Sequence, residues 1–327
     1  MKILLKLFLL TVAFPVVLFA SIFSDREESQ HAWETSPEIH WIDGSPSFDA
    51  AKAFGNTFNF EASANFIDTA KFTSPIEVSR EHFFYSGYDL SLSYSFFVNS
   101  CDALTFGVTY CEDRFEWKEN HFFSQKNFSR VDFEFYGITY RMPNWVWRSG
   151  LAGSFDVDHW DDPVDYALCK YNLWGRYSYG LDFLPDLGLH IGITGRSGIA
   201  KEWLQPILGV DFSLCERWMV HLIYPVDLSI AYQWTDCFFV DLAYRNWNRR
   251  YRVDKDAILT KGIFEYRNHG LELGGHLKYR EYFHAGLYLG HTFHPAELVI
   301  HDMHNQNEDH FRLKSSFYMG GELVLCF

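Results

Sequence analysis

The feature that most constrains this fold is a strict alternation of apolar and polar residues, repeated along most of the chain. In the segment "GYDLSLSYSFFV", Tyr88, Leu90 and Leu92 alternate with serines and an aspartate. The same period recurs in "LTFGVTYC" (104–111), "VDLSIAYQW" (226–234) and "LELGGHLKYR" (271–280). A period of two places the apolar side chains on one face of a β-strand. Each strand therefore has one face against an apolar medium and the other against a polar one.

Two architectures satisfy this pattern: a soluble β-sandwich or barrel with its apolar face inside, and a membrane barrel with its apolar face outside. The chain holds 62 aromatic residues (32 Phe, 19 Tyr and 11 Trp), and membrane barrels use such residues as lipid-facing surface and interface girdles. The expected strands run about 9–14 residues, which suits a tilted strand that spans a bilayer. No helical period is found that could cover an open sheet, and a sheet in lipid must close on itself. The sequence therefore predicts an all-β fold, a transmembrane antiparallel up-and-down β-barrel.

The connections between the expected strands alternate in length, as outer-membrane barrels require. Short connections are expected at 99–103, 142–145, 184–187, 214–217 and 234–237. Longer polar connections are expected at 67–86, 117–128, 157–165, 197–205, 249–268 and 295–310. The short connection around Pro225 departs from the scheme. Counting both classes predicts about fourteen strands, with a range of 12–16, and an even number fits the rule for bacterial barrels.

The N-terminal segment predicts export. "MKILLKLFLLTVAFPVVLFAS" has a basic front, an apolar run and a small-residue close at Ala20–Ser21, which is the layout of a cleaved signal peptide. A retained N-terminal anchor is the alternative. We expect a signal peptide at 1–20, a polar periplasmic or lumenal arm at 21–56, and an outer-membrane barrel at 57–327. The formal charge of −14 becomes −16 without Lys2 and Lys6, which excludes nucleic acid as an expected partner.

The C-terminal strand "GGELVLCF" ends on an aromatic residue. Together with the signal peptide it resembles the assembly signal of Gram-negative outer-membrane barrels, carried here by Gly320, Leu323, Leu325 and Phe327. Met319 stands where that pattern often has a polar residue. The resemblance implies two partners, the lipid of the cell outer membrane and the barrel assembly machinery. Leu323, Leu325 and Phe327 are expected to face lipid, in a strand that pairs with the first strand near Phe58.

Two further stretches, 206–234 and 270–293, are similar to an uncharacterised family of outer-membrane β-barrel proteins. Members of that family carry a Trp strand that leads to a Pro and then a Tyr-containing strand, and Trp218, Pro225 and Tyr232 fit this pattern. The resemblance implies a fold and a location, and it brings no activity with it.

Charged residues on the polar face of the strands are expected to line the barrel lumen. They could pair with one another across the interior, or they could border a water-filled pore and set its selectivity. The candidates are Asp227, Asp241, Arg245, Glu272, His276, Lys278, Arg280, Arg312 and Lys314.

Two clusters could carry other chemistry. The acidic segment "DVDHWDDPVD" surrounds His159 with carboxylates, which could bind Ca²⁺ or activate a water, although a solvated loop has the same composition. The segment "HTFHPAELVIHDMHNQNEDH" is rich in His and carboxylates, and His294, His301 and His304 are weak candidates for a metal site. No catalytic residue and no cofactor is expected. The six cysteines show no metal-ligand spacing, and their pairing is left open.

The function expected from these observations is a porin-like channel for small polar solutes, or a structural barrel if the lumen is plugged. A surface-exposed binding or adhesion barrel that acts through its long loops is the first alternative. An outer-membrane hydrolase is the weaker one, because "NHG" at 268–270 is followed by no suitable Ser. The oligomeric state is left open.

Overall fold

The structure is a computed structural model, and it describes residues 56–74, 82–117, 120, 122–181, 184–280, 282–293, 296–305 and 307–327. The expected signal peptide (1–20) and all of the expected arm (21–56) except Asn56 lie outside the described residues.

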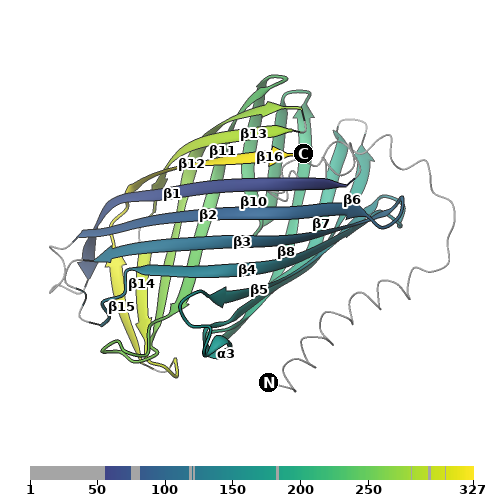
Figure 1. The fold of residues 1–327 in the computed structure, drawn as a ribbon. Helices are drawn as coiled ribbons and strands as arrows, with labels where there is room; N and C mark the ends of the chain where they lie inside the picture. The colour runs from purple at the N-terminus through teal and green to yellow at the C-terminus, as the bar shows by residue number, and fades with distance from the viewer. Residues whose placement is uncertain are drawn as a thin grey trace.

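The described residues form one antiparallel sheet of sixteen strands (Figure 1). A four-residue helix, α3 (Pro163–Tyr166), lies between β5 and β6. The strands are β1 (Thr57–Ser74), β2 (His82–Phe97), β3 (Asp102–Trp117), β4 (Asn127–Thr139), β5 (Trp145–Asp156), β6 (Leu168–Leu181), β7 (Leu184–Gly198), β8 (Lys201–Cys215), β9 (Trp218–Tyr224), β10 (Asp227–Thr235), β11 (Phe238–Arg252), β12 (Ile263–Tyr279), β13 (Phe283–Thr292), β14 (Ala296–His301), β15 (Glu308–Leu313) and β16 (Phe317–Cys326).

The sheet closes as a barrel of fourteen strands, because two places in the ring are each shared by two short strands: β13 and β14 in one, and β15 and β16 in the other. β12 pairs with β14 through Ile263–Arg267 and with β13 through Gly270–Tyr279. In the same way, β1 pairs with β16 through Asn59–Ile67 and with β15 at Phe72 and Ser74. β13 and β16 therefore fill the last two places of the ring toward one end of the barrel, and β14 and β15 fill them toward the other. The predicted strand number, parity and antiparallel order are confirmed.

The first strand and the C-terminal residue meet where the barrel closes. The backbone N–H of Phe58 donates to the carbonyl oxygen of Phe327 at 2.8 Å, and the N–H of Phe327 donates to the carbonyl oxygen of Phe58 at 2.9 Å. Val324 and Cys326 are buried on the inner face, whereas Phe327 is exposed. The predicted pairing of the final strand with the first one near Phe58 is confirmed.

The barrel has two different ends, and we name them by what they carry. The terminal end holds Thr57, Phe327 and tight turns such as 216–217 and 236–237; the loop end holds α3 and the β14–β15 hairpin (Figure 1). Four of the five expected short connections are confirmed at the terminal end, whereas 184–187 belongs to β7. Four expected loops at the other end are wrong in extent, because strands fill much of them; in 67–86, β1 runs to Ser74 and β2 begins at His82. Only 199–200 separates β7 from β8, β12 begins at Ile263, and β14 and β15 occupy most of 295–310.

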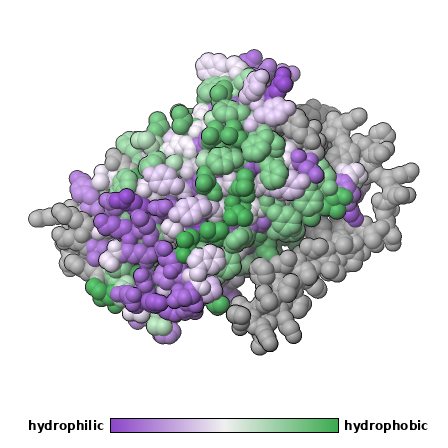
Figure 2. All heavy atoms as spheres, viewed as in Figure 1, coloured by the Kyte–Doolittle hydropathy of each residue, from purple (hydrophilic) through white to green (hydrophobic). Residues whose placement is uncertain are grey.

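The outer face of the barrel is apolar. Leu90, Ile191, Leu242, Leu273 and Leu287 are all exposed large hydrophobic residues on different strands. Figure 2 shows hydrophobic side chains across the middle of the visible face, with hydrophilic ones gathered toward the loop end. An apolar band around a closed sheet, with paired backbone throughout the wall, is the arrangement that a bilayer requires. The fold is thus a transmembrane β-barrel of the outer-membrane type.

Within the described ranges, no helix has the length and apolar character needed to cross a bilayer.

The largest hydrophobic core of the protein lies inside the barrel, in the half toward the loop end. Its members are inward-facing side chains of β1, β2, β3, β4, β11, β12, β14, β15 and β16, together with Phe123. β4 and β11 stand seven strands apart in the ring of fourteen, so they lie opposite each other. Nevertheless, the rings of Phe128 on β4 and Tyr251 on β11 are 4.8 Å apart. We call this core the aromatic plug, because side chains from opposite walls meet across the lumen.

The plug forms because the inward-facing residues change from polar to aromatic along the strands. On β3 the inner face carries Thr105, Thr109 and Asp113 and then turns aromatic at Phe115 and Trp117. The ring of Phe115 lies 4.8 Å from that of Phe264 on β12. Buried aromatic side chains contribute large apolar areas, and edge-to-face pairs of this kind add about 0.5–1.5 kcal/mol each. The half of the lumen toward the loop end is therefore a packed core.

Candidate functional site

A polar cavity of about 550 Å³ lies in the lumen beside the plug. Eight of its lining residues carry charged groups, four of each sign. The cationic residues are Arg130, Arg148, Lys170 and Arg249, and the carboxylates belong to Glu61, Asp89, Asp132 and Glu134. Serines, threonines and Asn172 complete much of the wall, so the cavity offers hydrogen-bond donors and acceptors in all directions. Its formal charge is balanced, which suits small polar or zwitterionic molecules better than a simple anion or cation.

The cavity charges are fixed by short contacts between neighbouring strands. Nζ of Lys170 on β6 donates to Oδ2 of Asp132 at 2.7 Å, and Nε of Arg130 lies 3.3 Å from Oδ1 of the same carboxylate. Nη1 of Arg130 also donates to the hydroxyl of Tyr251 at 3.2 Å. Arg130 therefore links the polar cavity to the aromatic plug on the opposite wall.

The border between cavity and plug is centred on Asp113. The hydroxyl of Tyr85 donates to Oδ1 of Asp113 at 2.6 Å, and the hydroxyl of Tyr251 donates to Oδ2. Nε of Arg249 lies 3.7 Å from Oδ2. A buried carboxylate is stable only when it is paired and hydrogen-bonded, and these three partners meet that condition. Because the partners come from β2 and β11, this cluster also ties opposite walls together.

A second polar cluster lies on β6, β7 and β8. Arg176 donates to both oxygens of Asp211, with Nε–Oδ1 at 2.9 Å and Nη2–Oδ2 at 2.7 Å. Nε2 of His190 lies 2.5 Å from Oδ1 of the same carboxylate. The bidentate geometry holds the carboxylate in one orientation. These charges are therefore part of the wall and are largely neutralised by their neighbours.

The structure places six of the nine expected lumen residues on the buried or half-buried inner face. Asp241 lies 2.9 Å from Nε2 of His276, and Oε1 of Glu272 accepts from Nε of Arg245 at 2.5 Å. Asp227 is also buried on this face. Local pairing thus accounts for most of these charges, which favours the paired-interior alternative for this part of the wall.

Lys278 is the sixth inward-facing residue, and the other three expected lumen residues lie off the inner face. Lys278 faces inward close to the terminal end, opposite His284 in the register. Arg280 lies in the turn after β12, and its guanidinium sits over the ring of Tyr279. Arg312 and Lys314 are exposed near the loop end, and Arg312 pairs with Glu297 on β14. The expectation that these last three residues line the lumen is wrong, because a turn and the break between β15 and β16 shift them off the inner face.

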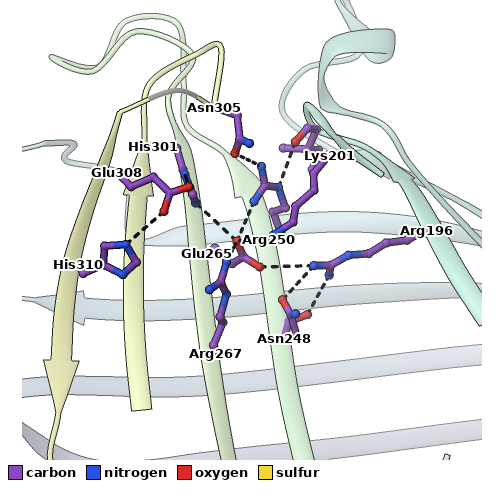
Figure 3. A network of polar contacts seen from close by, with 11 residues as sticks. Arg196, Lys201, Asn248, Arg250, Glu265, Arg267, His301, Asn305, Glu308 and His310 are labelled. Carbon is purple, nitrogen blue, oxygen red and sulfur yellow. Dashed lines mark hydrogen bonds and ion pairs between the residues drawn. The ribbon is translucent and has the colours of Figure 1, made fainter. Parts of the chain in front are cut away.

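Glu265 on β12 is the centre of a cationic cluster at the loop end (Figure 3). Arg250, Arg267, Arg196 and Lys201 lie within 2.7, 2.8, 3.5 and 3.8 Å of its carboxylate oxygens. Nε2 of His301 lies 3.5 Å away on β14. The side chains of Glu265 and Arg250 are both fully buried. We call these residues the Glu265 clamp.

The clamp explains how the β11–β12 hairpin is held in the lumen. Toward the loop end, β9 stops at Tyr224 and the chain returns in β10 from Asp227. β11 and β12 extend much farther in that direction. The β7–β8 turn covers the extended hairpin, and Nε of Arg250 donates to the carbonyl oxygen of Ile199 in that turn at 3.0 Å. One face of the hairpin therefore packs in the plug while the other is fastened to β7 and β8.

The acidic segment around His159 is engaged in local contacts. Nδ1 of His159 lies 2.7 Å from Oδ1 of Asp156, and its ring stacks on Tyr166 at 3.9 Å. Lys261 donates to Asp162 and Asp165 at 2.6 and 2.7 Å. The hydrogen bond from the Lys261 ammonium lowers the pKa of Asp165 below its usual range. These contacts favour a structural loop that is tied to the β11–β12 connection.

Of the three weak metal candidates in the last long segment, the two that the structure describes lie apart. His301 is buried on β14 in the Glu265 clamp, and His304 lies in the turn between β14 and β15. His294 lies outside the described residues. His301 and His304 therefore do not share a site, because a strand and a turn hold them in different surroundings.

The six cysteines all lie in described segments, and no disulfide joins any two of them. Gly320, Leu323 and Leu325 lie on β16, with Phe327 just beyond it, and their role as an assembly signal stays a prediction.

The chain is similar to uncharacterized proteins of Chlamydia species. The chain is 29% identical over 196 residues to an uncharacterized protein of Chlamydia pneumoniae, a match that covers 58% of each chain. It is 24% identical over 287 residues to an uncharacterized protein of Chlamydia trachomatis serovar D, with 83% of this chain and 87% of the relative covered. No family model matches.

Solved structures of similar shape are outer-membrane barrels. An outer membrane channel from Pseudomonas putida F1 has a TM-score of 0.46 and 9% identity, over 84% of this chain and 96% of that one. The toluene transporter TodX of Pseudomonas putida has a TM-score of 0.38 and 10% identity, over 89% and 94% of the two chains.

Proposed function

We propose that this outer-membrane-type barrel is a gated channel for small polar solutes, and that the structure is its closed state. The observation that carries the proposal is the coexistence of a charge-balanced polar cavity with an aromatic plug that bridges opposite walls. A purely structural barrel has no need for a hydrated cavity, since its interior could be filled by side chains as in small barrels. An open porin, in turn, has no packed core across its lumen.

The orientation follows from the two ends of the barrel. Outer-membrane barrels keep their tight turns in the periplasm and their longer connections outside. We therefore assign the terminal end to the periplasm and the loop end to the cell exterior. In this orientation the plug closes the exterior side, and the cavity lies farther toward the periplasm.

Gating requires that the plug can move without loss of the barrel. The β11–β12 hairpin is the natural moving part, because β9 and β10 stop short and leave the extension without backbone partners on that side. Its far face is held mainly by the side-chain contacts of the Glu265 clamp. Side-chain contacts can be exchanged for solvent or solute, and the ladder between Ile263–Arg267 and β14 is kept if β14 and β15 move with the hairpin. A solute that binds better when the hairpin is displaced would shift the protein toward the open state.

Conductance in planar bilayers tests the proposal. The wild-type protein is expected to give no steady current, whereas a Phe115→Ala/Phe264→Ala variant is expected to give ohmic current, because both rings of a contact across the lumen are removed. In that variant, an added Lys170→Glu change should shift selectivity toward cations, because it reverses a charge in the cavity wall.

The matched control for selectivity is Lys255→Glu, which changes the same type of charge in an exposed loop. Steady current from the wild type would contradict the closed state. A folded double-alanine variant without current, or with a selectivity that Lys170→Glu does not move, would contradict a solute path through the cavity.

A surface-exposed binding barrel is the second candidate. Trp160 and Ile258 are 55% and 87% exposed in two loops at the loop end. Those loops are tied together by Lys255–Asp161 at 3.1 Å and by the two contacts of Lys261. The tie gives an ordered apolar surface, which is the feature that favours this alternative.

A further inference from the structure

Three donor side chains converge in the lumen near the terminal end. His276, His284 and Glu322 lie on β12, β13 and β16, which are consecutive in the sheet. One ring nitrogen of each histidine and one carboxylate oxygen all lie within 4.8 Å of one another. This group lies away from the plug and from the segment expected to bind metal.

The distances suit a single small cation. Nδ1 of His276 lies 3.4 Å from Oε1 of Glu322, and Nε2 of His284 lies 3.7 Å from the same oxygen. Two ligands of a tetrahedral zinc ion with bonds of about 2.0–2.1 Å are separated by roughly 3.4 Å. Small rotations of the side chains would therefore bring the donors to bonding distance.

A glycine makes this convergence possible. Gly286 on β13 is the register partner of both His276 and Glu322. A Cβ at this position would lie 2.7 Å from Nδ1 of His276 and 2.9 Å from Oε1 of Glu322. Any larger residue would fill the space between the donors, so the wall is recessed where they meet.

The ring of His276 is held from two sides. Its Nε2 lies 2.9 Å from Oδ1 of Asp241, and a Cβ at the neighbouring Gly274 would lie only 2.1 Å from that oxygen. Phe239 stacks on the imidazole, with centroids 4.4 Å apart and planes 3° from parallel. A carboxylate that accepts from one nitrogen of a histidine directs the lone pair of the other toward a metal. Here that other nitrogen, Nδ1, faces Glu322 and His284.

We propose that His276, His284 and Glu322 form a binding site for a divalent transition metal, with Zn²⁺ as the best fit. Two imidazoles and one carboxylate are a common ligand set for zinc sites that keep a fourth position open, and here that position would face the lumen. Asp241 orients His276 as its hydrogen-bond partner. Lys278 is the register partner of His284, so its ammonium competes with the cation and lowers the affinity of the site.

The competing arrangement is an imidazolium of His276 bridged between Asp241 and Glu322. It needs no metal, and it predicts that the folded protein binds none. Gly286→Ala also distinguishes the two arrangements. It keeps every charge but fills the recess, so it should weaken metal binding if the three side chains hold a metal.

Cobalt titration of the untagged protein, folded in detergent and stripped with a chelator, tests the site. We expect one Co²⁺ per chain with the intense visible absorption of tetrahedral coordination, displaced by Zn²⁺. His284→Ala, Glu322→Gln and Gly286→Ala should each weaken binding at least tenfold. Asp241→Asn should weaken it about 10–100-fold, as loss of an orienting partner does.

His291→Ala is the matched control, because this exposed histidine of β13 lies beside Phe317 and away from the recess. Its binding should equal that of the wild type. Each variant is scored only if it still migrates faster unheated than boiled on a gel, which reports a closed barrel. A folded wild type that binds no Co²⁺, or binding unchanged by His284→Ala and Glu322→Gln, would overturn the proposal.

Discussion

Replacing Glu265 with Ala should destabilise the loop end of the barrel by about 3–5 kcal/mol, because one carboxylate serves several cationic groups there. Arg250 is fully buried and would lose its ionic partner at 2.7 Å. Arg267 and Arg196 would be left beside it with no carboxylate between them. Removing one member of a buried ion pair leaves an uncompensated charge, and that cost exceeds the net value of the pair.

The effect can be measured as the midpoint and free energy of denaturant unfolding in lipid or detergent. Protease cleavage in 253–262 gives a local readout of the same change. Glu297→Ala is the matched control, since Glu297 pairs at 3.6 Å with the exposed Arg312, and surface pairs contribute about 0–1 kcal/mol. A Glu265→Met/Arg250→Met variant should recover part of the loss, because the buried charge is removed with its partner. Equal stability of Glu265→Ala and Glu297→Ala would show that the clamp does not hold the hairpin.

Replacing Phe115 with Ala should cost about 3–5 kcal/mol of unfolding free energy, the range for a large aromatic truncated in a packed core. Phe115 lies within 6.0 Å, centroid to centroid, of six other rings: Phe83, Tyr85, Phe128, Tyr251, Phe264 and Tyr266. Its loss therefore leaves a cavity lined by rings from four strands and weakens the contact between opposite walls.

Phe106→Ala on the same strand is the control. Phe106 is 50% exposed on the outer face, so the same truncation removes fewer protein contacts and should cost clearly less. Denaturant unfolding of both variants, with heat-dependent gel migration as a check of closure, gives the comparison. If Phe106→Ala were as costly as Phe115→Ala, the lumen would not contain a packed core.

Much of the fold could be predicted from the sequence, because a period of two reports directly which side chains share a face. The terminal Phe327 and the first strand near Phe58 were expected to pair, and their backbones exchange two hydrogen bonds. The inward positions of Asp241, Glu272 and His276 followed from the same period. Alternation does not depend on tertiary context, which is why these predictions held.

The plug could not be predicted from alternation alone. Near the end of β3 the two faces exchange polarity: Phe115 and Trp117 point inward, while Arg114 and Glu116 lie on the other face, and that inversion could equally mark a long external hairpin. The segment 258–267 falls within the long connection expected at 249–268. In the structure, Ile263–Arg267 is the first part of β12, and it gains its place by packing against β2, β3 and β4. Such contacts join residues more than a hundred positions apart, and no local pattern encodes them.

The candidate sites were missed for related reasons. The segment "FSRVDFEFYG" does alternate, so Arg130, Asp132 and Glu134 could have been assigned to the lumen from the sequence. The recess at Gly286 had no such signal, because it depends on the register of β12, β13 and β16. His301 and His304 shared a segment, but a strand and a turn hold them in different surroundings.

Labelling of Cys111 tests the central claim most directly. This thiol is 4% exposed and borders the lumen cavity, behind the plug as seen from the loop end. The experiment uses a chain in which the other five cysteines are Ser, displayed in the outer membrane of cells, and a charged, membrane-impermeant thiol reagent added from outside. The account predicts slow labelling of this chain and labelling at least tenfold faster once Phe115→Ala and Phe264→Ala are added. Rapid labelling without those two changes, or no acceleration with them in a folded barrel, would contradict a lumen closed by the aromatic plug.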